Sequence, residues 1–485
     1  MSHDVSEEER VDRRSLLGLG AAMSVGRIET PFAATPVDVG PTEASIVRDT
    51  SALERTHGRA GNVVLTKSYD AALAPGLGGA RYVLTLSSRE KSGASRWIFE
   101  SPHQGLVWQL AEPRPEPEMF GAVGDGATDD SAALLAGLKY LAQVFEGGEL
   151  LLGPRQYRTR TLSLPKAVGI VGSSGGFAPH YPATLTASVH ALLLDEGATI
   201  MMHEASTLQG VVLRPYGMAF PQKQVQILQW SGTAITIAPE SAGVHIGRCL
   251  IVGFAQAILA SGEGPVFRTR IEDTSIDCLN GISLSVVPDV AYLTRIHAWN
   301  FATTGAGERN VTARPGVAFR LAHRADWAKI TDCFCYGYEI GFELDDVADC
   351  TLTGCGADHK PGRPGSASSI GFKLHGRARN NRLIGCQAAA QGRGIYLATN
   401  ATEPRLTNHV QGGTVWDNAV GLEISGGHAM ISDLAVRVRG GVLIGPASAG
   451  GRLDGLSFEG IAAPQVDGDA AAMRRFSITA PTIIG

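Results

Sequence analysis

The chain has 485 residues, a formal net charge of −5, and 60 glycines against only 6% aromatic residues. The acidic balance excludes the basic surplus of a typical nucleic-acid-binding protein, and no apolar run in the sequence is long enough to span a bilayer. Abundant glycine with few aromatic residues favours a turn-rich β architecture.

Residues 1–43 resemble an export leader. Arg13 and Arg14 follow an acidic, polar start and precede a run of small apolar residues, which is the order found in twin-arginine signals. Arg27 and Glu29 interrupt that run. We expect either such a leader, which would send the protein to the periplasm or out of the cell, or a disordered N-terminus with a chance arginine pair.

Residues 44–117 are expected to form a small β-rich head module. Short runs of strand-forming residues are separated by Gly and Ser turns. These runs cover residues 63–65, 81–86, 96–99 and 106–110. Pro113, Pro115 and Pro117 alternate with charged residues and predict a stiff, extended connector, so we expect a domain boundary there.

The next predicted domain, residues 118–465, begins with Phe120-Gly-Ala-Val-Gly-Asp-Gly-Ala-Thr-Asp-Asp130. An amphipathic helix is predicted directly after it, with Asp129 and Asp130 at its N-terminus, where capping carboxylates belong. The apolar residues on one face of this helix are Leu134, Leu138, Leu141 and Phe145. Such a helix would cover the unpaired strand edges at the start of a repeat structure.

A four-residue phrase then recurs: glycine, an apolar residue, any residue, and another apolar residue. Its copies begin at Gly281, Gly316, Gly341, Gly371, Gly394, Gly421 and Gly441. These intervals are too short for a βαβ crossover and lack helical spacing, so we predict a right-handed parallel β-helix, an all-β solenoid. Each glycine is expected to make a tight turn into its strand. Residues 466–485 are expected to form a C-terminal tail or cap.

A second repeated phrase places cysteines at one position of the repeat. They are Cys249, Cys333, Cys355 and Cys386, and we expect them to form a stacked, buried column. The alternative left open by the spacing is a zinc site made of Cys333, Cys335, Cys350 and Cys355. No other cofactor is indicated.

The segment from Phe120 to Asp130, the helix, Gly147-Gly-Glu-Leu-Leu-Leu152 and Tyr157-Arg158 resemble the N-terminal signature of the pectate-lyase-like superfamily of right-handed β-helices. The head is similar to modules of phage tailspikes and related bacterial polysaccharide-degrading proteins. The resemblance implies a carbohydrate substrate and catalytic residues on an outer face. The paired-Asp, Gly-His-Gly and Arg-x-Lys motifs of polygalacturonases are missing, as is the calcium-binding Asp cluster of pectate lyases.

In such a fold, the strand register predicts which outward residues are neighbours on the surface. Side chains alternate in and out along a strand, and equivalent outward positions on successive coils stand about 4.8 Å apart. One predicted outward column reads Ser283, Ala318, Glu343, Lys373, Tyr396 and Glu423, and a second reads Ser285, Arg320, Asp345, His375, Ala398 and Ser425. Together they predict a patch of titratable side chains: Arg320, Glu343, Asp345, Lys373, His375 and Tyr396.

Two reactions need residues of these types. In hydrolysis, Glu343 and Asp345 would be the proton donor and the nucleophile or base, with about 5 Å or 6.5–9.5 Å between them. In β-elimination or C5-epimerisation of a uronic acid, Arg320 would clamp the carboxylate. The candidates for acid or base would then be Lys373, His375 and Tyr396. A ladder of opposite charges that only stabilises the strands is the remaining interpretation.

Two long insertions, residues 303–315 and 356–369, directly precede strands of this patch and are expected to rise beside it. The second supplies charged side chains for substrate binding: Asp358, His359, Lys360 and Arg363. Trp299 and Trp327 lie near the first in sequence, and their indole rings offer flat surfaces for sugars.

Three functions fit this pattern. The first is an exported enzyme that acts on an acidic polysaccharide as a lyase, an epimerase or a glycoside hydrolase. The second is a non-catalytic carbohydrate-binding β-helix. The third is a structural spike subunit of phage origin, which a stable homotrimer would favour. Unsaturated products that absorb in the ultraviolet would separate a lyase from a hydrolase.

Overall fold

The computed structural model describes residues 45–484 apart from several short gaps. The gaps are 74–75, 88–94, 174–184, 186, 188, 261, 304–312, 360–367, 438–439 and 461–464. The predicted export leader lies outside the described residues, as do Lys360 and Arg363. None of the described helices combines the length and the apolar character that a membrane crossing needs.

A five-stranded sheet comes first in the chain, in the spatial order β1-β2-β3-β5-β4. Its elements are β1 (Ser45–Val47), α1 (Thr50–Leu53), β2 (Val63–Thr66), β3 (Arg81–Leu86), β4 (Ile98–Glu100) and β5 (Leu106–Leu110). Each of the four runs predicted in this region overlaps a strand. Tyr82 and Trp108 fill the interior of this sheet with side chains that are fully buried.

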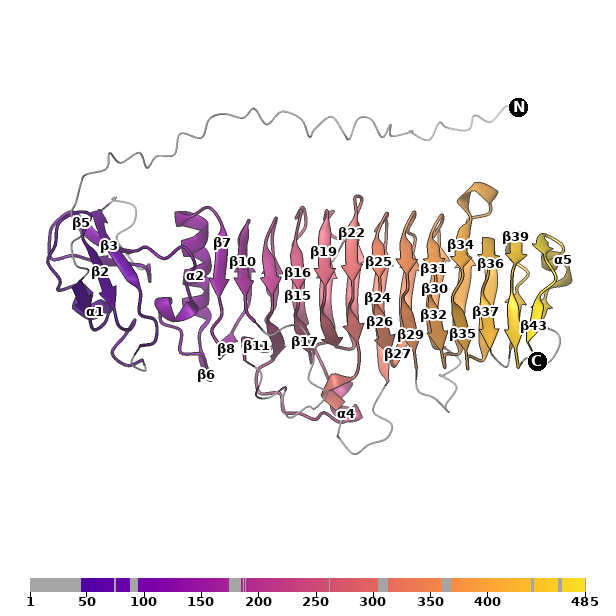
Figure 1. The fold of residues 1–485 in the computed structure, drawn as a ribbon, viewed down its shortest axis with the longest axis horizontal. Coiled ribbons are helices and arrows are strands. Elements are labelled where there is room, and N and C mark those ends of the chain that lie inside the picture. The colour runs from indigo at the N-terminus through magenta and orange to yellow at the C-terminus, as the bar shows by residue number, and fades with distance from the viewer. Residues whose placement is uncertain are drawn as a thin grey trace, which may run out of the picture. The chain divides into compact units, whose positions relative to one another are not determined.

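After η2 (Pro117–Phe120) and β6 (Asp125–Asp129), helix α2 (Ser131–Val144) lies beside the first coil of the solenoid (Figure 1). Leu134, Leu138 and Leu141 are buried as predicted, whereas Phe145 is 42% exposed because the helix ends before it. The carboxylate of Asp130 accepts hydrogen bonds from the backbone N–H groups of Val123 and Gly124, at 2.7 and 3.1 Å. This motif therefore fixes the loop that leads into the helix.

The rest of the chain winds in coils, and each complete coil gives one strand to each of three faces. Face 1 contains β7 (Gly148–Leu151), β10 (Val168–Val171), β13 (Thr207–Gln209), β16 (His245–Gly247), β19 (Thr269–Glu272), β22 (Ala291–Thr294), β25 (Lys329–Thr331), β28 (Thr351–Thr353), β31 (Arg382–Ile384), β34 (Asn408–Gln411), β39 (Ser448–Asp454) and β42 (Phe476–Ile478).

Face 2 contains β6, β8 (Gln156–Thr159), β11 (Ala191–Leu194), β14 (Val212–Pro215), β17 (Leu250–Val252), β20 (Ser275–Asp277), β23 (His297–Ala298), β26 (Phe334–Tyr336), β29 (Gly356–Asp358), β32 (Gln387–Ala389), β35 (Thr414–Trp416), β37 (Ala435–Arg437), β40 (Ser457–Glu459) and β43 (Thr482–Ile484). Face 3 contains β9 (Leu162–Leu164), β12 (Ile200–Met202), β15 (Thr233–Ile237), β18 (Gln256–Ala260), β21 (Asn280–Ser285), β24 (Arg314–Ala322), β27 (Tyr338–Asp345), β30 (Ile370–Gly376), β33 (Arg393–Thr399), β38 (Val442–Ile444) and β41 (Val466–Gly468). The long β36 (Val420–Ser432) belongs to face 3 by its first half and to face 1 by its second.

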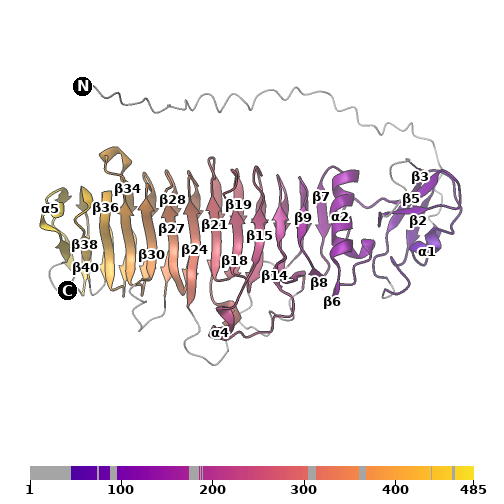
Figure 2. The same cartoon turned by 180° about the vertical axis from the view of Figure 1, so that it is seen from behind.

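Neighbouring strands of each face pair in parallel, and the strands of face 3 lie side by side in Figure 2. The predicted all-β, parallel β-helix is therefore confirmed. The short elements between or after the strands are α4 (Gln224–Ile227), η3 (Phe301–Thr303), η4 (Pro404–Leu406) and α5 (Ala470–Met473).

The inward residues of face 3 stack in register. The rings of Phe319 and Phe342 are 4.7 Å apart, those of Phe342 and Phe372 are 4.8 Å apart, and each pair is tilted by 10° or less. Gly371 does not make the turn that was predicted, because its φ angle is not positive. A Cβ atom added there would lie only 2.6 Å from the carbonyl oxygen of Gly394, so this glycine is required for the close approach of adjacent coils.

The predicted buried cysteine column is confirmed. All seven cysteines are free and buried. The thiol of Cys355 donates to the carbonyl oxygen of Ile330, 3.5 Å away, and the thiol of Cys386 donates to that of Leu352 at the same distance. In the described residues, no group of His, Cys, Asp or Glu is arranged to hold a metal ion.

The outer side of face 2 is covered in its N-terminal half by a second hydrophobic cluster, which the sequence did not predict. Trp230 and Ile227, beside and within α4, pack there against Leu250 and Phe301. A buried ion pair holds the covering segments in place. Arg314 Nη2 lies 2.7 Å from Asp277 Oδ1, both side chains are 0% exposed, and Asp277 Oδ2 accepts the N–H of Ala302 at 2.7 Å.

Candidate functional site

Strand register brings most of the predicted patch together on face 3. Glu343 stands opposite Lys373, and Asp345 stands opposite His375. Tyr396 follows Lys373 on the next coil. We call Arg320, Glu343, Asp345, Lys373, His375 and Tyr396 the face-3 cluster.

The predicted place of Arg320 in the second column is wrong. Arg320 stands opposite Glu343, in the first column, because Phe319 and not Val317 is the partner of Phe342. The copy that begins at Gly316 starts two residues too early, and Ala318, expected to face outward, is buried. The shift keeps Arg320 in the cluster and moves it by two residues, from the second predicted column to the first.

Glu343 is the centre of the cluster. Its Oε1 lies 2.8 Å from Lys373 Nζ and 3.1 Å from His375 Nε2, and its Oε2 lies 3.1 Å from Arg320 Nε. Arg320 also contacts Asp345, with 3.2 Å between Nη2 and Oδ2. The Glu343 side chain is only 8% exposed, whereas that of Arg320 is 40% exposed. The cluster therefore has a buried acid and an accessible guanidinium.

These contacts determine the charge of Glu343. Burial by itself raises the pKa of its carboxyl, but the hydrogen bonds from His375 and Lys373 and the positive charges of Lys373 and Arg320 outweigh burial and lower the pKa to about 2. Glu343 is thus ionised at every physiological pH and holds no proton that it could donate.

The free energy of unfolding of a Glu343→Gln variant should fall less on acidification than that of the wild type. Because the pKa of Glu343 is lower in the folded state than its ordinary value of 4.5, the stability that it contributes is present above about pH 4.5 and is lost as the pH falls towards 2. The fall to about 2 corresponds to on the order of 3 kcal/mol. Urea unfolding curves between pH 2.5 and pH 6 measure this pH dependence of the free energy of unfolding. Equal pH slopes for the variant and the wild type would contradict this, and Glu459→Gln, in an exposed pair, is the control.

Tyr396 lies at the end of the cluster away from Arg320. The guanidinium carbon of Arg393 is 5.2 Å from its ring centroid, and Arg393 forms an ion pair with Glu423. Within the described part of the chain the Tyr396 hydroxyl makes no hydrogen bond, and the side chain is partly exposed. Its oxygen is therefore available to a bound ligand.

The predicted substrate-binding residues do not all join this cluster. Trp327, 45% exposed, stands at the corner between faces 3 and 1, and its ring lies 5.8 Å from Lys329 Nζ. Trp299, Asp358 and His359 lie on or beside face 2 instead, at the opposite end of the face-3 strands. Because β27 has eight residues, the two ends of a face-3 strand are about 23 Å apart.

Around Trp299 the structure shows an aromatic strip that sequence analysis missed. It consists of His297, Trp299, Phe334 and Tyr336. The ring centroids of Trp299 and Tyr336 are 6.5 Å apart, and those of His297 and Phe334 are 5.5 Å apart. The phrase Phe334-Cys-Tyr336 was the available signal, since it places an outward aromatic ring on each side of an inward cysteine.

Asp358 continues this strip, because it is the register partner of Tyr336 on the next coil. Its Oδ1 accepts the backbone N–H of His359 at 2.7 Å. Burial raises the pKa of the Asp358 carboxyl, and the charge of Asp417 raises it further. Burial also lowers the pKa of His359. Unlike Glu343, Asp358 is thus a carboxyl group that is biased towards keeping its proton.

Comparisons with known proteins found similar structures and one short stretch of sequence similarity. No protein-family model matches the chain. The capsule K30/K69-specific depolymerase of Klebsiella phage K64-1 is 28% identical over 143 residues, which are 27% of this chain and 18% of that protein. The chain thus spans under a fifth of the length of this curated relative.

Two solved structures are similar to the chain. The tailspike of Acinetobacter phage vB_ApiP_P1 is 12% identical with a TM-score of 0.49, over 91% of this chain and 70% of that one. DFA-IIIase of Arthrobacter chlorophenolicus A6 is also 12% identical, with a TM-score of 0.50 over 77% of this chain and all of that one. The strand pairing makes the chain a parallel β-helix, and the likeness to DFA-IIIase agrees with this architecture. At 12% identity the likeness concerns the fold alone, so the chemistry must be argued from the side chains of this chain.

Proposed function

We propose that this protein is an exported enzyme that cleaves or modifies an acidic polysaccharide at the face-3 cluster. The observation that carries the proposal is the gathering of two carboxylates, two cations, a histidine and a free tyrosine hydroxyl on one outer face. The stretch of similarity to a capsule depolymerase supports the substrate class.

Elimination or epimerisation fits the cluster better than hydrolysis does. A glycoside hydrolase needs one carboxyl group that is protonated at the start of the reaction. Glu343, with a pKa of about 2, cannot be that group, and Asp345, the other carboxylate, is engaged by Arg320 at 3.2 Å and by His375 at 3.5 Å. In the other scheme Glu343 acts as a fixed anion that positions Lys373 and His375, a role for which a low pKa is suitable.

The geometry distributes the remaining roles. His375 has both ring nitrogens towards carboxylates, with Nε2 3.1 Å from Glu343 and Nδ1 3.5 Å from Asp345, so neither nitrogen is well placed as a base. Tyr396 and Lys373 are neighbours on adjacent coils. We assign to Tyr396 the removal of the proton next to the uronate carboxylate, and to Lys373 the neutralisation of that carboxylate.

Arg320 binds a different part of the chain. It stands three coils from Tyr396, about 14 Å away, which is too far to hold the carboxylate of the sugar that reacts. Its accessible guanidinium would hold the carboxylate of another sugar of the same polymer. In elimination, loss of the proton is followed by departure of the glycosidic oxygen and formation of a C=C bond. In epimerisation, the proton returns on the opposite side.

A panel of polysaccharides tests this proposal. Purified protein is incubated with polygalacturonate, alginate, hyaluronate and neutral dextran, while ultraviolet absorbance, viscosity, new reducing ends and, by NMR, uronate stereochemistry are followed. We expect absorbance to rise with an acidic polymer or, for an epimerase, the uronate stereochemistry to change without cleavage. Turnover of dextran alone would contradict the acidic substrate class.

Hydrolysis beside the aromatic strip is the second candidate, because the pKa of Asp358 is raised and aromatic rings stand next to it. It predicts new reducing ends without ultraviolet absorbance. An Asp358→Asn variant should then lose about 10²- to 10⁴-fold in kcat, while Glu343→Gln keeps its activity. The opposite pattern would assign the reaction to face 3.

A non-catalytic carbohydrate-binding protein or a tailspike-like structural subunit is the remaining alternative. It predicts binding without turnover and, for a spike, a stable homotrimer by light scattering. Export through a twin-arginine leader is tested separately. Replacing Arg13 and Arg14 by Lys in the full chain should keep the protein in the cytoplasm, and unchanged export would contradict a twin-arginine signal.

A further inference from the structure

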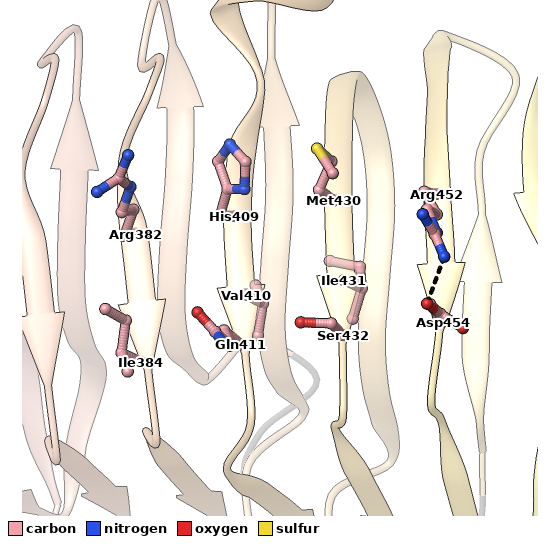
Figure 3. Close-up of a pocket in the computed structure, with 10 residues that line it drawn as sticks. All are labelled: Arg382, Ile384, His409, Val410, Gln411, Met430, Ile431, Ser432, Arg452 and Asp454. Atoms are coloured by element: carbon pink, nitrogen blue, oxygen red, sulfur yellow. Dashed lines mark hydrogen bonds and ion pairs between the residues drawn. The ribbon is translucent and has the colours of Figure 1, made fainter.

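A groove of about 410 Å³ opens on the outer side of face 1, in its C-terminal part (Figure 3). Four strands that follow one another on this face supply its walls: β31, β34, β36 and β39. It shares no residue with the face-3 cluster or with the aromatic strip.

Figure 3 shows the side chains of the groove in two rows that run across the strands. One row reads Arg382, His409, Met430 and Arg452, and these residues are register partners from coil to coil. The other row reads Ile384, Gln411, Ser432 and Asp454. Asp454 is the single carboxylate among the residues lining the groove, and Arg452 binds it at 2.6 Å.

For three more coils towards the N-terminus, the same two rows carry no carboxylate. Ahead of Arg382 the first row carries Tyr292, Lys329 and Thr351, and ahead of Ile384 the second carries Thr294, Thr331 and Thr353. We call the two rows from Tyr292 to Asp454 the face-1 strip. It spans seven coils, or roughly 29 Å. Glu272, the register partner of Thr294, ends the second row on the next coil and lies 2.9 Å from His245. Asp332 and Asp349 stand at the corners on either side of the strip.

The charge on the strip is not neutralised from within. The guanidinium of Arg382 is exposed and has no ion pair among the described residues. Lys329 Nζ reaches only neutral oxygens, the hydroxyl of Thr351 at 3.2 Å and the carbonyl of Asp349 at 3.5 Å. The strip therefore carries two cations, Lys329 and Arg382, that no carboxylate within it neutralises.

We propose that the face-1 strip is a second binding site, in which one linear anionic glycan lies along the solenoid axis. The cations attract its carboxylates, the threonine, serine and glutamine side chains bond its hydroxyls, and Tyr292 and Met430, 42% and 41% exposed, contact its apolar ring surfaces. The proposal rests on the proposed function only for the class of polymer. A single-stranded nucleic acid fits less well, because the two aromatic rings of the strip, Tyr292 and His409, stand four coils apart, which is too far to stack successive bases.

Affinity electrophoresis of the full chain tests the strip without reference to turnover. Gels contain polygalacturonate, neutral dextran or single-stranded DNA. We expect polygalacturonate to retard the wild type and dextran not to. The double variant Lys329→Glu/Arg382→Glu should bind polygalacturonate about tenfold more weakly. Arg437→Glu, an exposed reversal on face 2, is the matched control and should bind like the wild type.

Each outcome decides the matter. Unchanged retardation of the double variant, equal loss in the Arg437→Glu control, or stronger retention by DNA than by polygalacturonate would each overturn the strip. Retardation that depends on Lys329 and Arg382, without turnover of any polymer, would support the strip and count against the proposed enzyme. If turnover is found, the double variant should keep its rate on short oligosaccharides and lose rate only on long polymers.

Discussion

A Tyr396→Phe variant should lose about 10²- to 10⁴-fold in kcat on an acidic polysaccharide, since it lacks the oxygen to which we assign proton transfer. Within the described residues the hydroxyl has no hydrogen-bond partner, so its removal leaves no buried polar group unpaired. Stability should therefore stay within about 0.5 kcal/mol of the wild type. Initial rates of ultraviolet absorbance and a thermal unfolding curve measure the two effects.

The matched control is Tyr216→Phe, which removes an exposed hydroxyl on another face and should leave kcat unchanged. If Tyr396→Phe retains full turnover, the assignment of the base is wrong. If it loses turnover and stability together, Tyr396 has a structural role. The pH profile separates these further, because loss of a proton-transfer group removes one limb of the rate profile.

An Arg314→Leu variant should lose about 3–5 kcal/mol of stability in the coils that surround it, because Asp277 would be left fully buried without its cationic partner. Arg314 Nε also donates to Asp277 Oδ1 at 2.8 Å, and its guanidinium carbon lies 5.3 Å from the ring centroid of Trp230. The cover over face 2 should loosen first. Hydrogen exchange at Ala302 and fluorescence of Trp230 follow that region directly.

Arg268→Leu is the control for this change, because its partner Asp289 is exposed, and it should cost at most about 1 kcal/mol. A double variant, Asp277→Asn with Arg314→Leu, should recover part of the lost stability, because no buried charge then remains. An Arg314→Leu protein as stable as the wild type would show that the pair does not hold the cover.

The sequence predicted the fold well because its repeats determine strand register. The phrases led by Gly341, Gly371 and Gly394 place Glu343, Lys373 and Tyr396 at one height, as the structure does. The glycines recur for a different reason from the one predicted. They permit neighbouring coils to approach, whereas the corners between faces 1 and 2 use residues such as Asp273 and Asp332 with φ near 50°.

The site was harder to predict because insertions break the phrase. Gly316 follows a long insertion and matched the pattern by chance, whereas Phe319, aligned with Phe342 and Phe372, would have given the true register of Arg320. The cover over face 2 left no repeated signal, because its residues come from unrelated loops. Pairing distances decide the charge of Glu343, and no sequence pattern specifies those.

The alternation along each face-3 strand has one more consequence. Phe342 and Leu344 point inward, and Glu343 and Asp345 point outward. Adjacent residues are therefore constrained differently, the inward ones by core packing and the outward ones by surface contacts. Mutation can change the outward residues, and with them the polymer that we propose the protein recognises, while the inward residues keep the fold intact. Among related proteins we expect the outward residues of these strands to vary and the inward residues between them to be retained.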